Sequence, residues 1–163
     1  MDGAVETTYR DEQLARFRAG YSAVEAAVAG IADADLDRRP ADGGWPAREV
    51  VHHLADMEAH AYVRLRRLLA EAEPRLLAHD EDEYARRLHY DRPIASSLAV
   101  VRAVREASVE LLLNLTPEEW TRSGVHPERG SYSVERWLRI YAEHPHRHAD
   151  QIRIAIGSAA DGA

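Results

Sequence analysis

The sequence of 163 residues contains no cysteine. This absence excludes disulfide bonds, thiolate metal sites, iron–sulfur clusters and a cysteine nucleophile. Any thiol chemistry at this protein would therefore need a thiol that is supplied by a small molecule.

Lysine is absent as well, so arginine supplies all 21 basic side chains, and the formal net charge is −7. Because nucleic-acid binding generally needs a basic face, we expect no nucleic-acid partner. No apolar run approaches the roughly 20 residues of a membrane span, and the polar segment 1–12 lacks the apolar core of a signal peptide. We expect a soluble, cytoplasmic protein without a membrane partner.

Length and composition indicate one globular domain over residues 1–163. Domains most often have about 100–150 residues, and 45% hydrophobic with 30% charged residues is typical of a folded chain. Apolar residues recur at the spacing of amphipathic helices over 11–32, 47–71, 93–115 and 133–157. We see no strand pattern. The expected fold class is all-α, a four-helix bundle.

The segment 72–92 between the second and third helices is long, so simple up-down-up-down connectivity is not assured. Its acidic run 80–83 is expected to be a solvated loop or a short helix. Thr116-Pro-Glu-Glu119 has the sequence of a capping box and predicts one short helical turn. Residues 124–130 are expected to form a loop, after which Ser133 caps the last helix.

The chain has nine histidines, and six of them gather in two patches, between Val51 and Ala61 and between Glu143 and Ala149. On the 133–157 helix, at about 100° per residue, His144 and His148 lie on the same side of the helix, at the edge of the apolar face. His146 lies on the other side, toward solvent. Two histidines four residues apart on one face can chelate one metal ion.

The same projection separates the histidines of the 47–71 helix. His53 flanks the apolar stripe, whereas His52 lies near the opposite side, and His60 returns almost to the face of His53. We nominate His53 as the inward partner of the other patch and His60 as a neighbour. Hydrogen-bonded core histidines are the alternative, and spacing alone does not decide between the two.

Pro145 lies inside the 133–157 helix, where it removes a backbone donor and clashes with the carbonyl of Tyr141. We expect a kink at this position. In the alternative, the helix ends at His144, which then does not face His148.

Several motifs occur here in a specific order: Gly43-Gly-Trp-Pro-Ala-Arg-Glu-Val-Val-His-His-Leu-Ala-Asp56, Ala61-Tyr62, Asp80-Glu-Asp82, His126-Pro-Glu128 with Gly130, and Tyr141-Ala-Glu-His-Pro-His-Arg-His148. Over roughly residues 25–155 this set resembles the YfiT branch of the DinB-like superfamily. The resemblance implies a four-helix bundle, often a homodimer, with a divalent metal held by three histidines. Carried onto this chain, the metal ligands are His53, His144 and His148.

Members of that branch are described as metal-dependent hydrolases. Related members are S-transferases that use bacillithiol, mycothiol or glutathione. This chain departs from the usual pattern at Arg147 and Glu58, where the branch often has histidine, and at His60, where it often has a small polar residue. We expect Glu58 and His60 to shape the substrate pocket.

Three histidines with an open position are typical of a catalytic zinc site, and imidazole also suits nickel. We therefore expect transfer of a small thiol onto an electrophile, with the pocket shaped by segments 72–92 and 122–132. The alternatives are a hydrolase in which the metal activates water, a non-catalytic metal-binding stress-response module, and a structural bundle without metal.

Side chains near the three histidines in sequence are candidates for orienting them. Gln151, Glu143 and Asp56 are the polar candidates, although the helical projection points Asp56 away from the apolar stripe. Solvated polar residues are the alternative interpretation. We expect Trp45 to pack in the core at the start of the 47–71 helix. The sequence identifies no catalytic acid or base.

Overall fold

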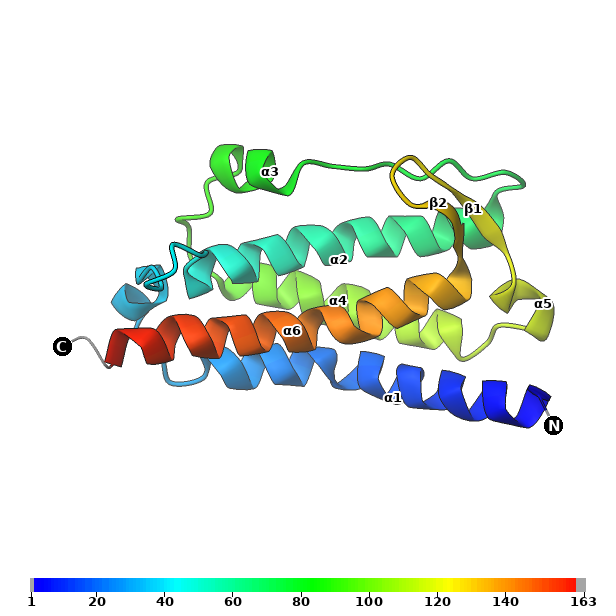
Figure 1. Ribbon diagram of the computed structural model, residues 1–163, viewed down its shortest axis with the longest axis horizontal. Helices are drawn as coiled ribbons and strands as arrows, with labels where there is room; N and C mark the ends of the chain where they lie inside the picture. Colours follow the sequence, from blue (N-terminus) through cyan, green and yellow to red (C-terminus); the bar gives the residue numbers. More distant parts are fainter. Residues whose placement is uncertain (1, 161–163) are drawn as a thin grey trace.

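The computed structural model describes residues 2–160, with side-chain burial described for 8–157. Four long helices form a bundle (Figure 1): α1 (Asp2–Val28), α2 (Ala47–Ala70), α4 (Ala95–Leu112) and α6 (Val134–Ala160). The connections contain η1 (Asp33–Asp37), α3 (Glu81–Arg87), α5 (Pro117–Trp120), β1 (Ser123–His126) and β2 (Gly130–Ser133). The predicted four-helix bundle is confirmed.

The connection between α2 and α4 sets the topology of the bundle. In Figure 1 it runs back along the outside of the bundle, past α3, to the end at which α2 begins. As a result α2 and α4 run in the same direction, and α1 and α6 run opposite to them. The bundle is therefore not connected up-down-up-down.

Two helix predictions need correction at their ends. The first helix begins at Asp2 instead of residue 11. It stops at Val28 instead of residue 32, because Gly30 adopts φ of 75° and turns the chain. Ile31 continues the apolar spacing beyond that turn and still packs on the core, which explains the overlong prediction. The third helix begins at Ala95 and ends at Leu112, inside its predicted range of 93–115.

The expectation of a loop over 124–130 and of no strands is wrong. β1 and β2 form an antiparallel hairpin in which Ser123 pairs with Ser133 and His126 with Gly130. The strands have four residues each, and the buried positions of β1 are Gly124 and His126, so no apolar alternation marks them.

The hairpin is joined to the α2–α4 connection. The N–H of Leu76 donates to the carbonyl of Val125 at 2.8 Å, and the N–H of Val125 donates to the carbonyl of Pro74 at 2.9 Å. Gly124 permits this approach, since a Cβ there would lie 2.4 Å from the Pro74 oxygen. The two long connections are thereby held together at one side of the bundle.

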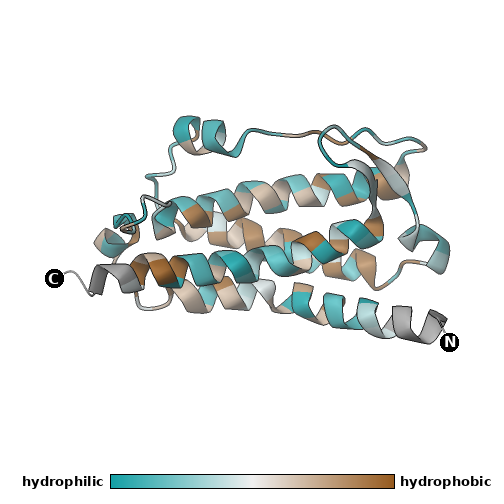
Figure 2. Ribbon diagram, viewed as in Figure 1, coloured by the Kyte–Doolittle hydropathy of each residue, from teal (hydrophilic) through white to brown (hydrophobic). Residues whose placement is uncertain are grey.

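Hydrophilic and hydrophobic residues alternate along the long helices (Figure 2), and the hydrophobic side chains form the core. Trp137 is fully buried and donates its indole N–H to the carbonyl of Ala61 at 2.9 Å. The predicted caps are present: Thr116 closes a capping box with Glu119, and Ser133 accepts from the N–H of Arg136 at 3.1 Å. The acidic run 80–83 begins a short helix, as one of its two expectations stated.

No helix within residues 2–160 is both long and apolar enough to cross a membrane.

Candidate metal centre

Three histidines meet between α2 and α6. His53 comes from the second turn of α2, and His144 and His148 come from consecutive turns of α6. Each offers one ring nitrogen, and these three atoms lie within 4.8 Å of one another. Because α6 continues through Pro145, His144 and His148 keep a common face, and the alternative in which the helix ends at His144 is wrong.

The His148 ring packs edge to face against each of the other two rings, and its Nε2 approaches that of His144 closely. Nε2 of His148 lies 3.1 Å from Nε2 of His144, and the centroid of the His53 ring lies 4.8 Å from that of His148. Nδ1 of His148 is 2.7 Å from Oε1 of Gln151. If that nitrogen donates to the amide oxygen, Nε2 of His148 carries a lone pair toward His144.

Burial keeps all three rings neutral. It lowers the pKa of His53 to about 3 and the pKa of His144 well below its ordinary value, and it also lowers the pKa of His148. Neutral imidazole is the form that binds a metal ion. These electrostatics therefore match a cation site.

Two ring nitrogens at the cluster make no hydrogen bond to the described residues. They are the buried Nδ1 atoms of His53 and His144, whereas the nitrogen of His144 that faces His148 is Nε2. Buried polar atoms without partners are unfavourable by roughly 1–3 kcal/mol. Three converging imidazoles with lone pairs that face one another fit a divalent cation better than a hydrogen-bonded core.

Of the three polar residues that the sequence suggested for orienting the histidines, one contacts a histidine of the cluster and two have other partners. Gln151 contacts His148 as predicted, so it orients that ring. Glu143 is ion-paired with Arg16, and Asp56 points away and accepts a hydrogen bond from the Tyr90 hydroxyl at 2.6 Å.

Trp45 packs on the core next to α2, as expected, and its ring meets the His53 ring edge-on at 5.0 Å. The indole thereby covers one side of the candidate site.

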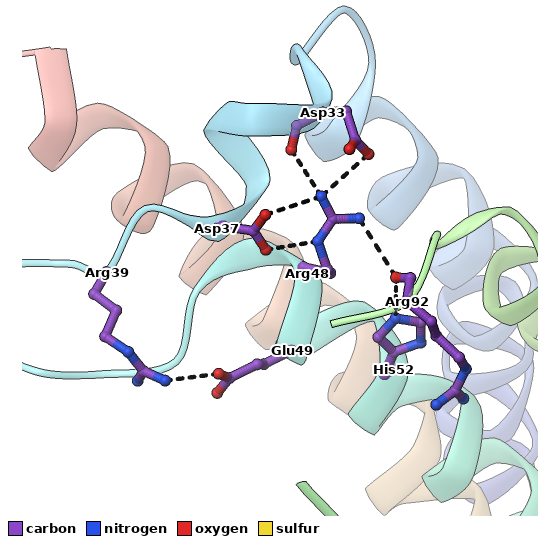
Figure 3. A network of polar contacts seen from close by, with 7 residues as sticks. All are labelled: Asp33, Asp37, Arg39, Arg48, Glu49, His52 and Arg92. Carbon is purple, nitrogen blue, oxygen red and sulfur yellow. Dashed lines mark hydrogen bonds and ion pairs between the residues drawn. The ribbon is translucent and has the colours of Figure 1, made fainter. Parts of the chain in front are cut away.

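His52 takes no part in the cluster. Figure 3 shows its ring beneath the carbonyl of Arg92, to which Nε2 donates at 2.9 Å, while Nδ1 accepts from the Ser97 hydroxyl at 2.7 Å. The Arg92 carbonyl also accepts from Arg48, which is itself ion-paired with Asp37. This network holds the first turns of α2 with His52 facing away from His53.

His60 and Glu58 also lie outside the cluster, which corrects two expectations. His60 stacks on His79 with ring centroids 4.2 Å apart. It lies two helical turns beyond His53, whereas two ligands of one metal on a helix are typically one turn apart. Glu58 is fully buried and ion-paired with Arg105. Of the residues that the structure describes, neither Glu58 nor His60 lines the pocket over the three histidines.

That pocket has a volume of about 690 Å³. Ala78, His79 and Glu81 from the α2–α4 connection and His126, Glu128 and Arg129 from the hairpin line it together with the three histidines. Both segments expected to shape a pocket therefore do so. Arg147, the departure from the family pattern, also lines it.

Sequence reasoning missed His79, Arg64 and Tyr141 as pocket residues. His79 is a single histidine in an irregular segment, so no spacing marks it. Arg64 lies only about 20° from Met57 in the helical projection, at the edge of the apolar stripe, and that position was the available signal.

Comparisons with known proteins agree with this geometry. The model of the DinB superfamily matches residues 16–152. A "putative metal-dependent hydrolase" of Oceanobacillus iheyensis is 38% identical over 117 residues, which cover 72% of this chain and 68% of that protein. A protein of the same description from Bacillus pumilus is 31% identical over 142 residues, covering 86% and 79% of the two chains.

A solved structure shares the fold. YfiT from Bacillus subtilis, described as "a probable metal-dependent hydrolase with an unusual four-helix bundle topology", superposes with a TM-score of 0.85 at 28% identity. The match covers 92% of this chain and 87% of that one.

Proposed function

This chain belongs to the DinB superfamily, and from that premise we propose that it is a metal-dependent enzyme that transfers a low-molecular-weight thiol onto an electrophilic small molecule. His53, His144 and His148 would hold the ion, which we propose to be zinc or nickel. The observation that carries the proposal is the convergence of three neutral imidazoles at the pocket of about 690 Å³.

A divalent ion bound there supplies a Lewis acid that favours the deprotonated form of a thiol or of water in its open position. The chain's own residues do the positioning. Gln151 orients His148, and the Trp45 ring shields His53 from one side. The α2–α4 connection and the hairpin form the walls against which the electrophile binds.

The carboxylates close to the ligands in sequence favour a thiol over water as the nucleophile, because each of them already has a partner. Asp56 accepts from Tyr90, Glu143 is ion-paired with Arg16, and Asp150 is ion-paired with Arg153. A thiol has a pKa of about 8.5, far below that of bulk water, so it loses its proton with less need of a carboxylate base. In the transfer, the thiol gives its proton to solvent, the thiolate sulfur forms a bond to the electrophilic carbon with its lone pair, and the leaving group departs with its bonding electron pair.

Hydrolysis is the second candidate, and the names of the relatives favour it. Glu81 and Glu128 line the pocket and would be the carboxylates available to accept a proton from water. A requirement for added thiol separates the two reactions.

The test begins with the metal content of untagged protein. We expect about one zinc or nickel ion per chain in the wild type and in His146→Ala, whose ring lies outside the cluster and contacts the Arg16 carbonyl. His148→Ala should lose the ion. No ion in the wild type after soaking with zinc or nickel would overturn the proposal.

Activity then decides the reaction. The metal-loaded protein is incubated with an electrophilic aryl halide and, separately, with activated esters, in each case with and without bacillithiol, mycothiol or glutathione. Thiol-dependent consumption of the halide supports transfer, and thiol-independent ester cleavage supports hydrolysis. If neither reaction is observed, the result favours the non-catalytic metal-binding module. A homodimer and a cytoplasmic location remain predictions that accompany this proposal.

A further inference from the structure

The buried arginines of this protein differ in their charge partners. Arg48, Arg64 and Arg105 are 3%, 8% and 3% exposed. Arg48 is ion-paired with Asp37, and Arg105 is ion-paired with Glu58. Within the described part of the chain, Arg64 has no carboxylate at ion-pair distance. A buried charge without a counter-ion is strongly unfavourable, so the missing counter-ion of Arg64 needs an explanation.

The contacts of Arg64 fix its guanidinium without neutralising it. One terminal nitrogen donates to the Tyr141 hydroxyl at 2.8 Å, and the other donates to the Leu77 carbonyl at 2.5 Å. Its Nε is buried and has no hydrogen-bond partner. Since a guanidinium offers five N–H donors, several remain for a further acceptor.

Arg64 lies beside the candidate metal centre. It lines the same pocket as the three histidines. Its partner Tyr141 precedes His144 by three residues, about 4.5 Å along α6, and the two rings are 6.1 Å apart. A single small molecule is therefore long enough to reach both the histidines and Arg64.

The other charged side chains of the pocket are also mostly positive. Arg129, Arg139 and Arg147 line it with Arg64, against the carboxylates of Glu81 and Glu128. Glu143 also lines it but is neutralised by Arg16. Glu81 is exposed. It interacts with Arg64 electrostatically, but it lies too far away to form an ion pair with it. In a chain of net charge −7, this pocket is a local positive region that attracts anions.

We propose that Arg64 binds an oxyanion group, a carboxylate or a phosphate, of the small molecule whose reactive atom lies at the three histidines. This inference rests on the proposed function and adds the chemical class of its substrate. A planar guanidinium suits either oxyanion, since two parallel N–H groups match two oxygens.

The test uses probes that bind a zinc ion whether the enzyme is a transferase or a hydrolase. The monohydroxamates of succinic, adipic and suberic acid carry a zinc-binding end and a carboxylate end, and their ω-amide analogues lack only the charge. Binding to zinc-loaded protein is measured by calorimetry, after the zinc content has been determined. Analogues with a phosphonate in place of the carboxylate tell which oxyanion the site prefers.

At the best chain length we expect the acid to bind at least tenfold more tightly than its amide in the wild type. The preference should disappear in Arg64→Gln and persist in Arg102→Gln, which removes an exposed arginine of α4 that pairs with Glu106 and does not line this pocket. The comparison of acid with amide in the wild type needs no variant, so it can overturn the inference even if Arg64→Gln does not fold.

The outcomes separate the two proposals. Equal binding of acid and amide at every length, with zinc bound, overturns this inference and leaves the proposed function standing. A preference that survives in Arg64→Gln also overturns it. A wild-type protein that binds no zinc overturns the proposed function and this inference with it.

Discussion

The guanidinium of Arg105 on α4 donates two hydrogen bonds, each of 3.3 Å, to the carbonyl oxygen of Tyr141 on α6. In an ideal helix this carbonyl would accept from the N–H of residue 145, but Pro145 has none. Arg105 therefore satisfies the backbone group that the proline leaves free. Glu58 neutralises Arg105, so α2 and α4 together support α6 next to His144.

A double-mutant cycle tests this relationship. Arg105→Met should lower the free energy of unfolding by about 3–5 kcal/mol, because it leaves Glu58 buried without a partner and the Tyr141 carbonyl without a donor. In a Pro145→Ala background the loss should be smaller by about 1–3 kcal/mol, since the new N–H satisfies that carbonyl. Urea unfolding of the four proteins gives the coupling energy.

The exposed pair Arg102–Glu106, on the same helix, is the control for removing a charge. Arg102→Met should change the free energy of unfolding by less than about 0.5 kcal/mol. Equal losses from Arg105→Met with and without Pro145 would contradict the compensating role.

Gly20 makes room for Arg105. A Cβ at this position would lie 2.6 Å from an Arg105 terminal nitrogen and 3.0 Å from the Pro145 ring. Gly20→Ala should therefore destabilise the protein by about 1–3 kcal/mol, despite the better helix propensity of alanine. Thermal unfolding measures the change.

Gly157→Ala on α6 is the matched control, because no atom of the described residues lies within 4 Å of the new Cβ. It should stabilise the protein by about 0.5–1 kcal/mol. If both alanines act in the same direction, the steric argument for Gly20 is wrong.

Gln151 is expected to tune metal binding without being a ligand. Gln151→Ala removes the acceptor of the His148 Nδ1–H and should weaken zinc binding at least tenfold. Competition against a zinc-binding dye measures the affinity. Asp150→Ala removes an exposed partner of Arg153 from the adjacent position and should leave the affinity unchanged. Equal affinities of wild type and Gln151→Ala would show that the glutamine does not orient the ligand.

His79 should make stability depend on pH. Burial, followed by the charges of His60, Arg64 and His126, lowers its pKa to about 4, whereas Asp80 acts in the opposite direction. The native state keeps His79 neutral at pH 5.5, and the unfolded chain protonates it below about 6.5. Its contribution is therefore complete above pH 6.5 and is lost as the pH falls toward 4.

Between pH 7.5 and 5.5 the free energy of unfolding of wild type should fall by roughly 1 kcal/mol more than that of His79→Gln. Urea unfolding at the two pH values measures the difference. The same pH dependence in both proteins would exclude a strongly shifted pKa of His79.

Much of the candidate site follows from helical geometry in the sequence. The spacing of His144 and His148 fixes a common face, and the position of His53 beside the apolar stripe of α2 turns it toward that face. Gln151, about one turn beyond His148 on α6, follows by the same rule. These relations are local to one helix, so 3.6 residues per turn determine them.

The hairpin, the partner of the Tyr141 carbonyl and the unpaired charge of Arg64 could not be predicted in this way. The hairpin joins the α2–α4 connection because Gly124 lets the Pro74 backbone approach, and that contact links segments about 50 residues apart. Arg105 lies 36 residues from Tyr141 in the sequence. Only the packing of one helix on another brings such groups together.

The sequence by itself determined which faces of the helices are apolar, where the chain turns and which histidines share a face, because periodicity and backbone stereochemistry act over a few residues. The tertiary structure alone decided which buried charge receives a counter-ion. Arg48 and Arg105 meet carboxylates from other segments, whereas the acceptors that Arg64 meets among the described residues are the neutral Tyr141 hydroxyl and Leu77 carbonyl. That difference depends on distances across the bundle, which no pattern along the chain encodes.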